Sequence, residues 1–249
     1  MIACFLYLIR NFIMNHSLNQ ENLLKNEGVT LIGLLLEKCN PDTIDVNVLM
    51  AVQLLVEAVQ SQIPQTNTEL LKIFYSEIIF NFKIWSKTNF QITIGQIQYI
   101  NSLIKDDRKY FRKKFGIQFI LNVIKEYYIV PDNLTLDDCK TIRLSLLTIV
   151  KYYIQKELNV NEVNIIISFM AIEKHECIII ELIKMLISHM ESKNCKDQIF
   201  LLMYEPHTAE LLYSLFVDKV YTSDLYEVLL KVQFILNIYY FAFDIKSLN

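Results

Sequence analysis

The chain has 249 residues, of which 53% are hydrophobic, and it contains only four glycines and four prolines. Sheet-containing folds need more turn-forming glycine and proline than this, so the composition favours an all-α protein. A formal net charge of −3 argues against a dedicated nucleic-acid-binding protein, which normally carries a basic excess. The five cysteines are spread without a CxxC pair, as expected for reduced thiols in a cytoplasmic protein with neither disulfides nor a zinc site.

The first predicted elements are two apolar helices separated by the polar stretch "NHSLNQENLLKNEG" (15–28). Ser17 and Gln20 have the S-x-x-Q spacing of a capping box, which predicts a short helix that begins at Ser17. We expect Gly28 to adopt the left-handed conformation that turns the chain into the next helix. His16 is therefore predicted to be a turn residue with no part in chemistry.

Further helices are predicted wherever apolar residues recur at steps of three and four. These stripes occupy residues 43–60, 69–84, 92–104, 115–129, 140–154, 162–172, 178–190, 208–220 and 225–243. The segments between them are short and polar and contain all four prolines, which is typical of helix ends. No segment is long enough to indicate a linker between domains.

A weak internal repeat accompanies these helices. The stretches "GVTLIGLLL", "GIQFILNVI" and "TAELLYSLF" begin at Gly28, Gly116 and Thr208 and share their apolar positions. Their spacing is about twice the period of roughly 40–47 residues that characterises armadillo and HEAT repeats. The pattern predicts an armadillo/HEAT-like α-solenoid, with an irregular helical bundle as the alternative.

Catalytic chemistry has little support in the sequence. There is no glycine-rich phosphate loop, and the acidic pairs are neighbours that do not share a helix face. Metal-binding spacing is missing around each of the four histidines, which are His16, His175, His189 and His207. We therefore predict a protein that is not an enzyme and has no catalytic, metal-binding or cofactor-binding residue, no cofactor and no small-molecule substrate.

One charged segment is distinctive, the stretch "KDDRKYFRKK" (105–114), called here the basic segment. On a single helix, its first four basic residues would line one face at steps of three and four. One hypothesis is a surface for an anionic partner, either an acidic protein or acidic lipid headgroups. The alternative is a solvated face on a short connecting helix, partly neutralised by Asp106 and Asp107. The candidate residues are Lys105, Arg108, Lys109, Arg112, Lys113 and Lys114.

Three stretches of the chain resemble a known family. They are "FLYLIRNFIMNHSLNQENLLKNEGVTLIGLLLEK" (5–38), "LLKIFYSEIIFNFKIW" (70–85) and "FGIQFILNVIKEYY" (115–128). Each is similar to a segment of the neurobeachin-like BEACH-domain proteins, and looser similarity continues through 137–190. In that family, this region is an armadillo-like helical scaffold upstream of PH-like, BEACH and WD-repeat modules.

The resemblance implies a non-enzymatic scaffold that binds proteins in vesicle trafficking and membrane protein sorting. It also implies a cytoplasmic location, peripheral on endomembranes, and anchoring of protein kinase A through its regulatory subunit by the parent family. The downstream modules are absent from this sequence. We therefore expect residues 1–249 to form a single armadillo-like helical domain that is a fragment of a much larger scaffold protein, a divergent short form being the alternative. A peripheral membrane module that binds acidic lipids through the basic segment is the second functional hypothesis.

Overall fold

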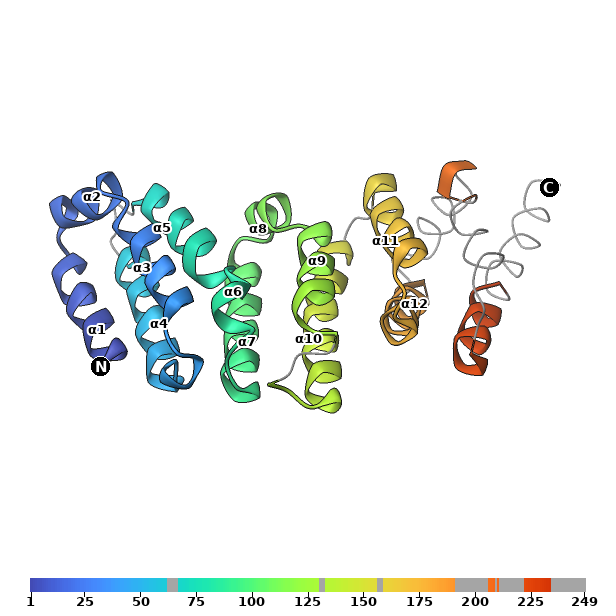
Figure 1. The fold of residues 1–249 in the computed structure, drawn as a ribbon. Coiled ribbons are helices and arrows are strands. Elements are labelled where there is room, and N and C mark those ends of the chain that lie inside the picture. The colour runs from blue at the N-terminus through green and yellow to red at the C-terminus, as the bar shows by residue number, and fades with distance from the viewer. Residues whose placement is uncertain are drawn as a thin grey trace. The chain divides into compact units, whose positions relative to one another are not determined.

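A computed structural model describes residues 1–61, 67–129, 133–155, 159–190, 206–208, 210 and 222–233, and within these ranges the regular structure is helical, without a strand (Figure 1). The α-helices are α1 (Ile2–Ile13), α2 (Ser17–Lys25), α3 (Gly28–Lys38), α4 (Val46–Gln60), α5 (Thr68–Phe74), α6 (Phe82–Trp85), α7 (Phe90–Asp106), α8 (Arg108–Lys114), α9 (Ile117–Tyr127), α10 (Leu136–Ile154), α11 (Val160–Ile172) and α12 (Glu176–Met190). A 3-10 turn η1 (Pro41–Thr43) and a π-helical segment η2 (Tyr75–Ile79) complete the series. Residues 223–233 are also helical. The all-α prediction is confirmed.

The chain divides into two compact units. The first comprises Met1–Asp107 and Lys125–Ser145, and the second comprises Arg108–Ile124 and Leu146–Asn249. The boundary therefore crosses the chain three times, between α7 and α8, within α9 and within α10. That residues 1–249 form a single domain stays a prediction.

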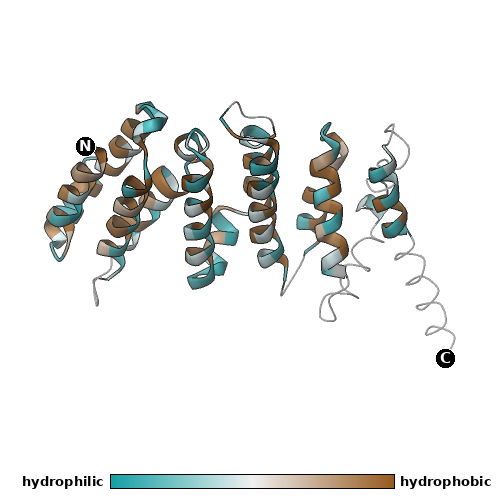
Figure 2. Ribbon diagram, turned by 90° about the horizontal axis from the view of Figure 1, so that it is seen from below, coloured by the Kyte–Doolittle hydropathy of each residue, from teal (hydrophilic) through white to brown (hydrophobic). Residues whose placement is uncertain are grey.

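The helices form because each has an apolar face to bury. α1 packs along α4, and α4 also contacts α5 and α7. Figure 2 shows hydrophobic and hydrophilic residues sharing the same helices. The stripe predicted in 43–60 is buried in α4, where the side chains that are less than 5% exposed include Val48, Leu49, Val52, Leu55, Val56 and Val59. The helices predicted between residues 92 and 190 are likewise confirmed, whereas most of 208–220 and 225–243 lies outside the described residues.

The turn between α1 and α2 differs from the predicted capping box. The N-cap of α2 is His16, whose Nδ1 accepts a hydrogen bond from the Asn19 amide at 3.3 Å. Gln20 donates instead to the carbonyl of Ile13 at 3.0 Å and is buried. The capping-box prediction was wrong because the last carbonyls of α1, which have no partner within that helix, accept hydrogen bonds from the side chains of Asn19 and Gln20 once the fold brings α2 beside them.

The turn into α3 also differs from its prediction. The left-handed residue is Glu27, with φ 53°, and no described glycine has a positive φ. Gly28 is already the first residue of α3. A Cβ at Gly28 would lie 2.5 Å from Cδ1 of Leu23, so the glycine relieves crowding between α2 and α3.

The helix predicted over 69–84 is interrupted. α5 continues as the π-helical η2, and Asn81 then begins α6 by accepting from the Lys83 amide at 3.3 Å. The buried Trp85 ring donates from Nε1 to the carbonyl of Ile78 at 2.7 Å. Gln96 of α7 donates to the carbonyl of Ile79 at 2.6 Å. Gln96 thus pairs a buried carbonyl that the interruption would otherwise leave without a partner, and Trp85 adds a shorter bond to the Ile78 carbonyl, which also accepts from the Asn81 amide at 3.4 Å.

In the second unit, α11 packs against α12. Ile166, Ile167 and Met170 of α11 are buried, as are Ile178 and Leu182 of α12. None of the helices in the described part of the chain combines the length and the hydropathy needed to cross a bilayer.

Candidate functional site

The basic segment does not form one helix. α7 ends at Asp106, and Asp107 has non-helical backbone angles of φ −139° and ψ 72°. Arg108 then starts α8, so Lys105 belongs to a different helix, and to a different unit, from the other five basic residues. The prediction that the first four basic residues share one helix face was wrong because the chain turns at Asp107.

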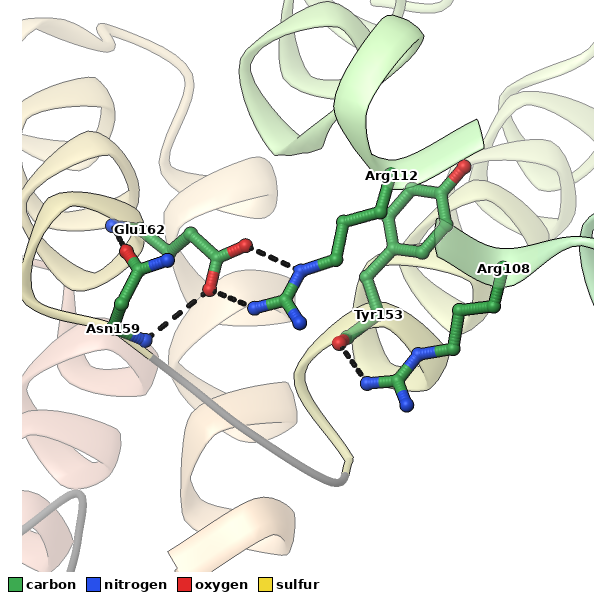
Figure 3. Close-up of polar contacts among 5 residues, drawn as sticks. All are labelled: Arg108, Arg112, Tyr153, Asn159 and Glu162. Atoms are coloured by element: carbon green, nitrogen blue, oxygen red, sulfur yellow. Dashed lines mark hydrogen bonds and ion pairs between the residues drawn. The ribbon is translucent and has the colours of Figure 1, made fainter. Parts of the chain in front are cut away.

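Arg108 binds the end of α10 (Figure 3). Its guanidinium donates a hydrogen bond to the main-chain carbonyl of Tyr153. The same guanidinium carbon lies 5.6 Å from the centre of the Tyr152 ring, within the range of a cation–π contact. Carbonyls in the last turn of a helix have no partner within that helix, and a cation there also meets the negative end of the helix dipole. Arg108 is therefore a C-terminal cap for α10.

Arg112 forms an ion pair with Glu162 of α11. The Arg112 Nε donates to Oε1 of Glu162 at 2.7 Å, and Nη2 donates to Oε2, so both carboxylate oxygens are bound (Figure 3). Both side chains are largely removed from solvent, being 19% and 12% exposed. Glu162 also closes the capping box of α11, since its Oε2 accepts from the Asn159 amide at 3.2 Å. The ion pair therefore joins α8 to the first turn of α11.

Both arginines thus bind other residues of the second unit, whereas the lysines are exposed. Phe111 is buried and anchors α8. The exposed ammonium groups on α8 belong to Lys109, Lys113 and Lys114, and Lys105 is exposed at the end of α7. No hydrogen bond or ion pair joins these four lysines to another described residue. Whether they bind an anion stays a prediction, which now concerns the lysines without the arginines.

His175 belongs to a hydrogen-bonded turn between α11 and α12. His175 Nδ1 lies 2.7 Å from Oε1 of Glu173, and the same oxygen accepts the amides of Lys174 and His175. Burial raises the pKa of Glu173, but the hydrogen bonds from His175 and Lys174 outweigh it, so the pKa lies below its ordinary value. The contact closes the turn between α11 and α12, and Cys177 is exposed. Within the described ranges, no three His, Cys, Asp or Glu side chains are grouped to hold a metal ion.

One concave feature was not predicted from the sequence. It is a groove of about 400 Å³ between α4 and α7, called here the α4–α7 groove. Its residues are Met50, Gln53, Leu54, Glu57, Gln60, Tyr99, Ser102, Leu103 and Asp106. The polar residues of α7 recur at steps of three and four, a faint signal that the stronger apolar stripe on the same helix hides.

Comparison with protein families identifies the chain. The model of the neurobeachin/BDCP, DUF4704 alpha solenoid region matches residues 1–218. The chain belongs to this family. The predicted resemblance to neurobeachin-like proteins and the predicted α-solenoid fold are thereby confirmed.

A curated relative agrees with this neurobeachin-type assignment. The BEACH domain-containing protein lvsD of Dictyostelium discoideum is 24% identical over 145 residues, which cover 53% of this chain and 5% of the relative. The neurobeachin-type chain thus spans about a twentieth of that protein's length. No solved structure matches the chain.

Proposed function

We propose that this neurobeachin-type region is a non-enzymatic scaffold segment that binds other proteins in vesicle trafficking and membrane protein sorting. The observation that carries the proposal is the family match over residues 1–218, within a region named for its solenoid. Solenoids bury each repeat against its neighbours and leave extended surfaces for partners. The exposed leucines of α3 support a protein-binding role, since Leu31, Leu34 and Leu35 are 46–56% exposed at the spacing of one helix face.

Proximity labelling tests this proposal directly. The full 249-residue chain, fused to a biotin ligase, is expressed in cells beside the ligase alone. We expect enrichment of vesicle-coat and sorting proteins and a cytoplasmic signal concentrated on endomembranes. A labelled set identical to that of the free ligase would contradict the proposal.

Kinase anchoring is the finer part of the proposal and comes from the family resemblance alone. No residue of this chain is assigned to that contact. A pull-down of purified protein kinase A regulatory subunit by the full chain tests it, with free tag as the control. Retention above the control at micromolar concentration supports anchoring by this chain, and background retention contradicts it.

Binding to acidic lipids is the second candidate function. It is favoured by the exposure of Lys109, Lys113 and Lys114 on one short helix. Each lysine near an anionic membrane contributes about 1 kcal/mol of binding free energy. Changing all three to Glu should abolish sedimentation with phosphatidylserine vesicles.

The matched control for lipid binding changes three exposed lysines elsewhere, Lys38, Lys83 and Lys140, to Glu. This variant has the same net charge as the α8 variant. Equal loss of sedimentation in the two variants, or no sedimentation of the original chain, would remove the lipid hypothesis.

A further inference from the structure

The α4–α7 groove has an apolar base and polar edges. Leu103 is buried at its base, and Leu54 and Met50 are progressively more exposed beside it. α4 and α7 approach closely near their first turns, where a Cβ at Gly95 would lie 3.0 Å from Cδ2 of Leu49. The groove therefore lies between two helices that pack directly against each other.

The charge of the groove has one sign. Glu57 of α4 and Asp106 at the end of α7 each contribute an exposed carboxylate, and no lysine, arginine or histidine lines the groove. Neither carboxylate forms an ion pair with another residue in the part of the chain that the structure describes. The groove thus carries two negative charges that no cation within it balances.

Tyr99 lines the groove together with both carboxylates. Burial raises the pKa of the Tyr99 hydroxyl well above its ordinary value, and Tyr75 and then the negative charges of Glu57 and Asp106 raise it further. The phenol therefore remains a neutral hydrogen-bond donor at any physiological pH. Gln53 and Ser102 add neutral hydrogen-bonding groups beside it.

We propose that the α4–α7 groove binds a basic peptide segment of a protein partner. A lysine or arginine of the peptide would pair with Glu57 and Asp106, and an adjacent apolar side chain would lie on Leu54 and Leu103. Charge complementarity selects a cation, and the apolar base selects a peptide over a small hydrated ion. This proposal rests on the proposed scaffold function, because it specifies the chemistry of one protein that the scaffold would bind.

The test is fluorescence anisotropy with the full chain and a labelled helical peptide in which arginines at i and i+4 are flanked by leucines. Its twin has citrulline at both arginine positions, which removes the charge and keeps the shape. We expect saturable binding of the arginine peptide and binding of the twin weaker by about fivefold, the size expected for two partly exposed ion pairs. Added salt should weaken the binding of the arginine peptide only.

Two variants separate the groove from general electrostatics. Glu57→Gln with Asp106→Asn should weaken the arginine peptide by about fivefold, to the level of the twin. Asp42→Asn with Glu69→Gln makes the same change in net charge at exposed positions away from the groove, and should leave binding unchanged. Circular dichroism checks that both variants remain folded.

The proposal is overturned if the arginine peptide does not bind, if its twin binds as tightly, or if the two double variants weaken binding equally. These failures differ from failure of the scaffold function. Proximity labelling would still identify trafficking proteins if the scaffold binds them through another surface.

Discussion

In the first unit, Trp85 and Gln96 donate to the carbonyls of Ile78 and Ile79, whereas in the second unit Arg108 donates to a carbonyl of α10 and Arg112 to a carboxylate of α11. The first pair of donors is neutral and fully buried. The second is charged and remains in partial contact with solvent. Both pairs of donors join helical elements through polar contacts.

The difference sets the free energy that each contact carries. A buried carbonyl that loses its donor cannot turn to water, so the loss costs about 1–3 kcal/mol. A charged pair near the surface is weakened by solvent and salt, and its partners can regain hydration when it breaks. We therefore expect the neutral contacts at η2 to contribute more to stability than the arginines of the basic segment.

The largest expected effect is that of Trp85→Phe. The change removes the shorter of the two hydrogen bonds to the carbonyl of Ile78, leaves the indole donor's place empty and opens space in the core, so the free energy of unfolding should fall by about 3 kcal/mol. Urea unfolding followed by circular dichroism measures it. Tyr226→Phe, at a ring that is 55% exposed, is the control and should change stability by less than about 0.5 kcal/mol. A loss below about 1 kcal/mol for Trp85→Phe would contradict the comparison.

A second variant tests the contact of η2 with α3. A Cβ at Gly33 would lie 2.6 Å from the main-chain oxygen of Glu77, which cannot move aside alone. Gly33→Ala should therefore cost about 2 kcal/mol despite the better helix propensity of alanine. Gly95→Ala is the matched control, because its Cβ meets only a movable leucine methyl, and it should be neutral or stabilising. Equal effects at the two glycines would show that helix propensity decides both.

The apolar stripes predicted nearly every helix, because burying one face is what makes a helix of this length stable. They failed at Tyr75–Asn81, where apolar spacing continues through "FYSEIIFNFKIW" while the backbone changes to a π-helix. The π-helix coincides with the close approach of Gly33 to the Glu77 carbonyl and with the hydrogen bond from Trp85, both of which depend on tertiary structure.

The prediction that the basic residues share one helix face was wrong for a similar reason. The composition of the basic segment indicated a charged surface, but the partner of Arg112 lies 50 residues away in the chain. The Arg108 contact is with a main-chain carbonyl, which no sequence pattern marks. Local composition was enough to predict only that the lysines are exposed.

Arg112→Gln is expected to have a smaller effect than the buried changes. Loss of the paired hydrogen bonds leaves Glu162 with its capping-box contact, so the free energy of unfolding should fall by about 1–2 kcal/mol at low salt. The loss should shrink in 0.5 M NaCl, a test condition in which charges are screened over a Debye length of about 4–5 Å. Lys113→Gln removes an exposed charge from the same helix and is the control. A salt-independent loss, or an equal loss for Lys113→Gln, would show that the ion pair contributes little.

The smallest effect on stability should come from His189. Its side chain is buried, like the neutral donors at η2, yet it can carry a charge, like the two arginines. Its side chain is 2% exposed, and burial lowers its pKa, with the charge of Lys151 lowering it further. The unfolded chain, with an ordinary histidine pKa near 6.5, therefore binds the proton more readily than the folded chain does. Stability from the neutral imidazole is present above about pH 6.5 and is lost as the pH falls toward the lowered pKa.

His189→Gln should accordingly reduce the drop in the urea midpoint between pH 7.5 and pH 5.5, two test conditions that avoid the ordinary carboxyl range near pH 4. Glu173, whose pKa is also lowered, loses its contribution only at more acidic pH and so does not obscure the measurement. His207→Gln, at an exposed position, is the control and should leave the pH dependence unchanged. If the midpoints of the original chain and the His189 variant fall in parallel, burial of this imidazole does not couple its proton to folding.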